Sequence, residues 1–319
     1  MLYNITGGKN VSSFCRHLLI SRKGAIIMKI SKMHGIGNDY IYINCFEETV
    51  EEPEKVSVIV SDRHKGIGSD GLVLIMPSDK ADFRMRIFNA DGSEAMMCGN
   101  ATRCIGKYVY DMGMTSKTDI TLETNSGIKY LKLFTENNKV KLVQVDMGKA
   151  ILNPTEIPVK SDSERFINQP VTVAGKVWNM TCVSMGNPHA VIFTDNVDSL
   201  DLEKIGPDFE NHEIFPNRVN TEFCEVIDSH TLKMRVWERG SGETFACGTG
   251  TCATVVAGVL NGICPYDEEV LVHLRGGDLR ITYQSDGTVM MTGEAEYICD
   301  GNISEEFINS KKENVICRN

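Results

Sequence analysis

Two cysteine residues, Cys98 and Cys247, stand in matching local sequences that lie 149 residues apart. Each cysteine is followed by glycine, and a glutamate, Glu94 or Glu243, precedes each by the same distance. A thiol has a pKa near 8.5, so one thiolate and one thiol can remove and return a proton close to neutral pH. The residue types and their spacing therefore indicate two proton-transfer groups, one for each face of a single carbon.

The same spacing recurs well beyond the cysteines. The further matches are Gly186-Asn187 on Gly37-Asn38, Arg235-Val236-Trp237 on Arg86-Ile87-Phe88, and Gly262 on Gly113. Several matches at a single spacing predict two copies of one domain, each with its own Cys-Gly element.

Each Cys-Gly element is expected to open a helix. Apolar residues recur at helical spacing from Gly99 to Met112, and an almost wholly apolar segment runs from about Gly248 to Leu260. A helix N-terminus presents free N–H groups and a partial positive charge, which stabilise a thiolate or bind a carboxylate. Cys104 and Cys252 fall inside these helices and are interpreted as packing residues.

The sequence around the two helices predicts mostly short strands separated by turns. They predict an α+β fold of two pseudo-symmetric domains, each a mostly antiparallel sheet wrapped around a central helix. We expect domains at 28–147 and 148–289, with a strand near 290–303 as a candidate to return to the first domain. Residues 1–27 are interpreted as an extension without function, either an upstream over-extension or a basic targeting segment. Residues 304–319 are expected to be a frayed polar tail.

Composition narrows the function classes. A net charge of −10 argues against a nucleic-acid surface, and no apolar run approaches the length of a membrane span. The 11 cysteines include no Cys-x-x-Cys pair, so we expect free thiols in a reducing, cytoplasmic compartment and no metal site. A small-molecule substrate is the expected partner, and the oligomeric state stays open, with a homodimer as one candidate.

Several segments together resemble the diaminopimelate epimerase family, in the family's order from residue 28 to about 302. The segments are His34-Gly35-Ile36-Gly37-Asn38-Asp39, Asn89-Ala90-Asp91-Gly92-Ser93-Glu94, Cys98-Gly99-Asn100, Gly186-Asn187-Pro188-His189, Arg218-Val219-Asn220, Glu238-Arg239-Gly240 and Gly242-Glu243-Thr244 with Cys247-Gly248-Thr249-Gly250. The resemblance implies a cofactor-independent epimerase that interconverts LL- and meso-diaminopimelate, in lysine and peptidoglycan precursor biosynthesis.

The resemblance also implies a role for each matching residue. Cys98 and Cys247 would be proton donor and acceptor, and His189 and Glu238 would tune the two thiols. The residues that would hold the substrate are Asn38, Asn89, Asn187, Asn220, Glu238 and Arg239. Those that would bind carboxylate at the helix starts are Gly99, Asn100, Gly248 and Thr249.

Other interpretations stand beside this one. A proline-racemase-like enzyme of the same architecture is one, although a monocarboxylic substrate would not need Asn187, Asn220 and Arg239. A non-catalytic binding protein for a diamino-dicarboxylate is another. The segment 66–71 matches a dinucleotide Gly-x-Gly-x-x-Gly pattern, but a strand-like stretch follows it where that pattern needs a helix. Some family members place a substrate-contacting Gln where this chain has Gly71.

Overall fold

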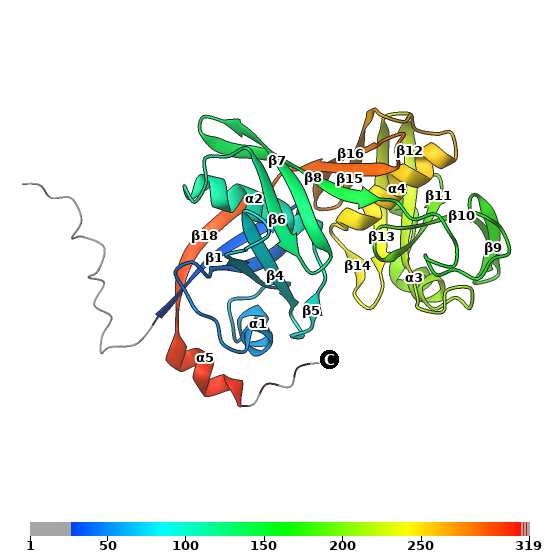
Figure 1. Ribbon diagram of the computed structural model, residues 1–319. Helices are drawn as coiled ribbons and strands as arrows, with labels where there is room; N and C mark the ends of the chain where they lie inside the picture. Colours follow the sequence, from blue (N-terminus) through cyan, green and yellow to red (C-terminus); the bar gives the residue numbers. More distant parts are fainter. Residues whose placement is uncertain (1–26, 314, 316, 318–319) are drawn as a thin grey trace, which may run out of the picture.

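Two stretches of the chain, related by the 149-residue spacing, fold into the same arrangement of strands around one helix and form two lobes (Figure 1). The structure is a computed structural model, and it describes residues 27–313, 315 and 317. The first lobe contains β1 (Ile27–Gly35), β2 (Asn38–Asn44), α1 (Pro53–Ser61), β3 (Gly71–Met76), β4 (Phe83–Asn89), β5 (Glu94–Ala95), α2 (Gly99–Asp111), β6 (Asp119–Thr124), β7 (Gly127–Glu136) and β8 (Lys139–Lys149).

The second lobe begins with an additional strand, β9, and then repeats the order of the first lobe, with α3 in the place of α1. It contains β9 (Gln169–Val173), β10 (Lys176–Ser184), β11 (Pro188–Phe193), α3 (Leu202–Glu210), β12 (Asn220–Asp228), β13 (Thr231–Glu238), β14 (Gly242–Thr244), α4 (Gly248–Leu260), β15 (Glu269–Leu274), β16 (Gly277–Tyr283) and β17 (Thr288–Gly293). A short 3₁₀ helix (Val197–Ser199) precedes α3, and β18 (Glu296–Ser304) and α5 (Glu305–Lys312) complete the chain.

The strand registers repeat as well as the element order. Tyr40 pairs with Gly71 across the parallel β2–β3 ladder, and His189 pairs with Asn220 across the parallel β11–β12 ladder. The next ladder in each lobe, β3–β4 or β12–β13, is antiparallel, and its paired residues in the two lobes also differ by 149 in number. Residues 149 apart therefore occupy equivalent positions, so the two halves can be compared side chain by side chain.

Helices α2 and α4 lie inside the sheets of their own lobes. Ala101, Cys104, Ile105 and Val109 of α2 belong to the same buried cluster as most of α4. Every residue of α4 from Thr251 to Val259 is buried, as the apolar sequence predicted. Both helices therefore contribute to one hydrophobic core.

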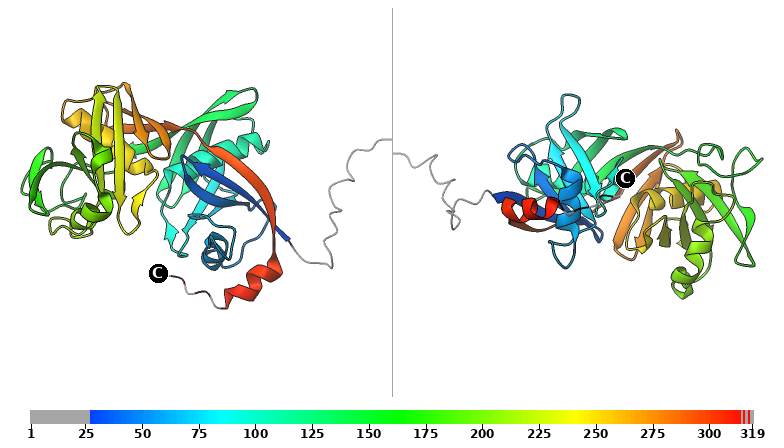
Figure 2. Two further views of the ribbon diagram at one scale, coloured as in Figure 1. Left: turned by 180° about the vertical axis from the view of Figure 1, so that it is seen from behind. Right: turned by 90° about the horizontal axis from the view of Figure 1, so that it is seen from below.

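Two strand pairings join the lobes. The equivalent strands β8 and β17 pair antiparallel, and β18 crosses back to pair antiparallel with β1 (Figures 1 and 2). The C-terminal strand therefore adds to the first lobe. The α+β fold of two repeated, sheet-dominated halves is confirmed.

The ends of the chain differ from the expectations. Residues 305–312 form helix α5, and Ile308 is buried in a cluster with Val56 and Ile59 of α1. The prediction of a frayed tail from Ser304 was wrong for this stretch, because its apolar side chains cover the outer face of the first lobe. The interpretation of residues 1–27 falls outside the described residues apart from Ile27.

Among the described residues, no helix is long and apolar enough to cross a membrane.

Candidate active site

Both cysteines of the repeat cap a helix. Cys98 is the N-cap of α2 and Cys247 the N-cap of α4, each with extended backbone and a helix of 13 residues behind it. An N-cap side chain faces the N–H groups of the first turn that have no partner in the helix. Each thiol is therefore placed where a negative charge is stabilised by the backbone.

The Cys98 thiol lies in a pocket of amide groups. Its Sγ donates to Asn38 Oδ1 at 3.4 Å, and the Asn100 Nδ2 donates to the same oxygen at 3.2 Å. Burial raises the pKa of Cys98, while hydrogen bonds from the backbone N–H groups of Ala101 and Asn100 lower it, so that the pKa stays above its usual value. Burial raises the pKa of the nearby Tyr40 hydroxyl well above its usual value, and the charge of Cys98 raises it further.

The Cys247 thiol lies among hydroxyl, amide and carboxyl groups. Its Sγ accepts from the Gly250 N–H at 3.4 Å and lies 3.5 Å from Thr249 Oγ1. Burial raises its pKa well above the usual value, and the charges of Glu238 and Glu222 raise it further. Cys247 is thus the harder of the two thiols to ionise.

Glu238 is the residue that links the two thiols. It accepts from the Thr244 hydroxyl, and its charge raises the pKa of both Cys98 and Cys247. Burial raises the pKa of Glu238 itself. The charge of this one carboxyl therefore makes both thiols harder to ionise.

The glycines after the cysteines meet at the junction of the lobes. A Cβ atom on Gly99 would lie 2.7 Å from Met291 Cε, and one on Gly248 would lie 3.2 Å from Met291 Sδ and 3.7 Å from Asn100 Oδ1. The first turns of α2 and α4 therefore approach each other around Met291, and side chains at these two positions would hold them apart.

His189 lies behind Glu222. Its Nδ1 is 2.7 Å from Glu222 Oε1 and its Nε2 is 3.1 Å from Asn187 Oδ1, and both His189 and Glu222 are fully buried. The Glu222 carboxyl in turn lies against Gly250, where an added Cβ would be 2.5 Å from Oε1. The structure therefore connects His189 to Cys247 through Glu222, a residue that the sequence reading did not select.

Asn220 and Arg239 are hydrogen-bonded neighbours in the second lobe. Asn220 is buried, and its amide donates to Pro188 O at 3.0 Å and accepts from the Arg239 N–H at 2.8 Å. Arg239 is exposed, and its Nη1 donates to Asn217 O at 2.8 Å. In the described part of the chain Arg239 has no ion pair, which leaves its guanidinium available for a carboxylate.

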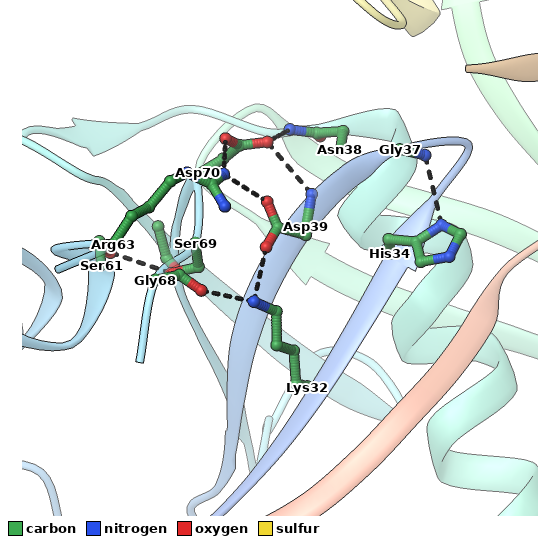
Figure 3. Close-up of polar contacts among 11 residues, drawn as sticks. Lys32, His34, Gly37, Asn38, Asp39, Ser61, Arg63, Gly68, Ser69 and Asp70 are labelled. Atoms are coloured by element: carbon green, nitrogen blue, oxygen red, sulfur yellow. Dashed lines mark hydrogen bonds and ion pairs between the residues drawn. The ribbon is translucent and has the colours of Figure 1, made fainter. Parts of the chain in front are cut away.

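Asn38 is fixed by a network of charged side chains in the first lobe (Figure 3). Its amide donates to Asp70 Oδ2 at 2.7 Å, and Asp70 and Asp39 share Arg63. Lys32 pairs with Asp39 on the other side at 2.9 Å. The amide oxygen of Asn38 is thereby turned toward the Cys98 thiol.

Asn89 is the last residue of β4 and is the first-lobe equivalent of Glu238. Its side-chain amide donates to Ser93 Oγ at 2.9 Å. Its neighbour across the ladder is Gly71, where an added Cβ would lie 2.0 Å from Phe88 O and 2.9 Å from the Tyr40 ring. The Tyr40 ring therefore occupies the space next to the position where some family members carry Gln.

No group of His, Cys, Asp or Glu side chains that could hold a metal occurs among residues 27–313, 315 and 317. The ten cysteines of this part of the chain are free, and Cys104 and Cys252 are buried packing residues. The segment 66–71 leads into strand β3, as expected, so it lacks the helix that a dinucleotide pattern requires.

The fold belongs to a class of two-lobed proteins. It resembles the crystal structure of a probable proline racemase from Agrobacterium radiobacter K84, with a TM-score of 0.68 at 12% identity, covering 89% of this chain and 95% of that chain. At this identity the likeness shows the fold alone.

Sequence comparison defines the family. The family model described as diaminopimelate epimerase matches residues 30–153 and 181–298. The diaminopimelate epimerase of Agathobacter rectalis is 60% identical over 284 residues, covering 86% of this chain and 99% of its own length, and that of Acetivibrio thermocellus is 61% identical over 277 residues, covering 86% and 98%. The chain belongs to the diaminopimelate epimerase family, and it is an isomerase that works as an epimerase. The resemblance noted in the sequence is confirmed.

Proposed function

We propose that this chain interconverts LL- and meso-diaminopimelate, with Cys98 and Cys247 as the two proton-transfer groups. The observation that carries the mechanism is the equivalent placement of both thiols at helix starts that approach each other around Met291. Family membership supports the substrate.

In the proposed reaction the two cysteines together accept one proton and donate one proton. One cysteine, as thiolate, takes the α-proton and becomes a thiol, while the other thiol gives its proton to the opposite face of the same carbon and becomes a thiolate. In the reverse direction the two cysteines exchange roles. These steps use no cofactor.

The substrate carboxylate next to the reacting carbon would lie on the first turns of α2 and α4. The N–H groups of Gly99, Asn100, Gly248 and Thr249 are the candidate donors there. As the α-proton leaves, negative charge moves into this carboxylate, and fixed donors aimed at it stabilise the transition state.

The far end of diaminopimelate carries a second amino-acid group, which an enzyme selective for it must hold. Arg239 can pair with its carboxylate in bidentate fashion, and the Asn38, Asn89, Asn187 and Asn220 amides, with Glu238, can order the remaining polar groups. An amino acid without the second group would leave such polar side chains unpaired, which is the basis for rejecting it.

The test is hydrogen exchange at the α-carbon in heavy water. The purified protein should incorporate deuterium into diaminopimelate and not into proline, and Cys98→Ala and Cys247→Ala should abolish epimerisation. Cys45→Ala, which removes a partly exposed thiol outside this site, is the matched control and should keep the wild-type rate. Exchange into proline alone would replace this proposal with a proline-racemase-like activity, and no exchange into either amino acid would favour a binding protein.

We also propose that the protein acts in the cytoplasm, which the ten free cysteines of the described residues support. A homodimer is the assembly that we propose, because exposed apolar side chains such as Tyr130 and Val177 offer surface for contact with a second copy. Light scattering after size-exclusion chromatography would decide between a monomer and a dimer.

A further inference from the structure

Arg103 is a fully buried cation without an anionic partner. Its exposed fraction is 0%, and none of the ion pairs among the described residues includes it. An arginine side chain stays protonated in proteins, and burial of an unpaired charge is costly. A fold that keeps such a charge must either offset it with hydrogen bonds or use it.

The guanidinium group reaches only uncharged atoms. Nη2 donates to Asn100 Oδ1 at 2.9 Å, Nε to the Glu294 backbone oxygen at 3.1 Å, and Nη1 contacts Met291 Sδ at 3.5 Å. These contacts fix the orientation of the group but leave its charge unneutralised.

The first of these contacts leads directly to a thiol. Because Arg103 holds the oxygen of the Asn100 amide, the Asn100 nitrogen is turned toward Asn38, whose oxygen accepts from both Asn100 and Cys98. Arg103, Asn100, Asn38 and Cys98 thus form a continuous chain. The positive charge of Arg103 also lowers the pKa of Cys98 against the effect of burial.

The third contact leads to the junction of the lobes. Met291 lies against the guanidinium group and also against Gly99 and Gly248, the first residues of α2 and α4. The charge of Arg103 is therefore placed one side chain behind both helix starts.

The repeat shows that this charge is not part of the shared framework. The position equivalent to Arg103 in the second lobe is Cys252, a buried neutral residue. A cation needed only to pack the helix would be expected in both copies.

We propose that Arg103 is a positioning residue for proton transfer, which orients the Asn100–Asn38 pair at Cys98 and stabilises the negative charge gained at the two helix starts as the α-proton leaves. This inference rests on the proposed function for the identity of the reaction. Arg103 itself does not touch the substrate.

Other titratable groups near Cys98 also influence its ionisation, so the test needs a control for them. Glu238 raises the pKa of Cys98 from the second lobe, and Tyr40, Tyr42 and Cys104 also lie close enough to interact with it. A change that affects only Arg103 should therefore be compared with removal of another cation of the same helix.

The experiment compares Arg103→Met, Arg103→Lys and the control Lys107→Met. Lys107 lies on α2 one turn beyond Arg103, but it is already paired with Asp111 at 2.9 Å. The readout is the pH dependence of iodoacetamide alkylation of Cys98, followed on its own peptide by mass spectrometry in a Cys247→Ala background. The kcat and KM for diaminopimelate are measured in the otherwise wild-type protein.

We expect Arg103→Met to move the alkylation midpoint of Cys98 upward by about one pH unit, a tenfold loss of thiolate below the midpoint, and to lower kcat by roughly 10–100-fold. Arg103→Lys should keep the midpoint, because it keeps the charge, but lose kcat, because lysine cannot hold several acceptors in a fixed fork. Lys107→Met should change neither quantity.

A folded Arg103→Met protein with an unchanged Cys98 midpoint would overturn the inference. If that variant does not fold, Arg103→Lys decides, since wild-type kcat in this variant would refute the positioning role. The alkylation readout does not depend on the substrate. A failure of the proposed function, seen as absent α-exchange in the wild type, is thereby distinguished from a failure of this inference.

Discussion

Glu243→Gln tests how firmly the strand before Cys247 is held. Arg235 binds the Glu243 carboxylate through two hydrogen bonds of 2.8 and 2.9 Å, and Arg275 approaches it at 3.1 Å. The equivalent pair in the first lobe, Arg86 and Glu94, has the same two hydrogen bonds at 2.8 and 2.9 Å. Glu94→Gln is therefore a matched control built into the repeat.

The two pairs differ in burial and in the second partner of the carboxylate, which is the charged Arg275 for Glu243 and the uncharged Asn125 amide, at 3.0 Å, for Glu94. The exposed fractions are 15% and 8% for the side chains of Arg235 and Glu243, but 30% and 30% for Arg86 and Glu94. A hydrogen bond to a charged group contributes about 1.5–3 kcal/mol when shielded from solvent, and an exposed ion pair about 0.2–1 kcal/mol. We expect Glu243→Gln to cost about 2 kcal/mol, a loss of roughly 3 °C in Tm, and Glu94→Gln less than half as much.

The pH dependence gives a second measurement. Burial raises the pKa of Glu243, but Arg235 and Arg275 lower it by more, so that the net pKa lies below 4.5. A lowered carboxyl pKa stabilises the folded state above the unfolded pKa, and this contribution is lost as the pH falls through the folded value. The Tm difference between wild type and Glu243→Gln should be full at pH 7 and shrink progressively below about pH 4.5. Equal losses for the two variants, or a difference that persists at low pH, would refute this reasoning.

Three further changes probe the surroundings of the thiols. Tyr40→Phe removes a hydroxyl that interacts with the Cys98 thiolate and should slow alkylation of this thiol several-fold at pH 8, measured by peptide mass spectrometry. Glu222→Gln takes the carboxylate from His189 and Cys247, and we expect kcat to fall by roughly tenfold or more while the circular dichroism spectrum is kept. Gly71→Ala places a Cβ against Phe88 O and the Tyr40 ring and should lower the free energy of unfolding in urea by about 2 kcal/mol or more; an unchanged unfolding midpoint would show that the strand can shift.

Much of the framework could be predicted from the sequence because it follows from local patterns. The helix expected from Gly99 to Met112 is observed at Gly99–Asp111, and the one from Gly248 to Leu260 has those bounds. Apolar periodicity and a following glycine are signals within one turn of the residues concerned. The repeat then placed both cysteines at equivalent helix starts.

The parts that were missed depend on contacts between distant residues. Strand β12 and helix α3 were not predicted, since Asn220–Asp228 lacks a clear alternation and Pro207 interrupts the helical pattern. Glu222 is in a strand and is buried, so only its contact with His189, 33 residues earlier, reveals its importance. Arg103 similarly looks like an ordinary polar helix residue until the strand carrying Met291 closes over it.

Comparison of the two lobes shows which features around the cysteines occur in both copies and which occur in only one. Both lobes keep the Cys-Gly helix start and the Arg–Glu pair before it. They differ in charge near the thiol, because Glu238 raises the pKa of both cysteines, but Arg103 lowers only that of Cys98 and Glu222 raises only that of Cys247. The cation lowers the pKa of Cys98 and the carboxylates raise that of Cys247, so Cys98 is the more acidic thiol. Two equal thiols would ionise equally easily, whereas these unequal surroundings make Cys98 the easier of the two to ionise.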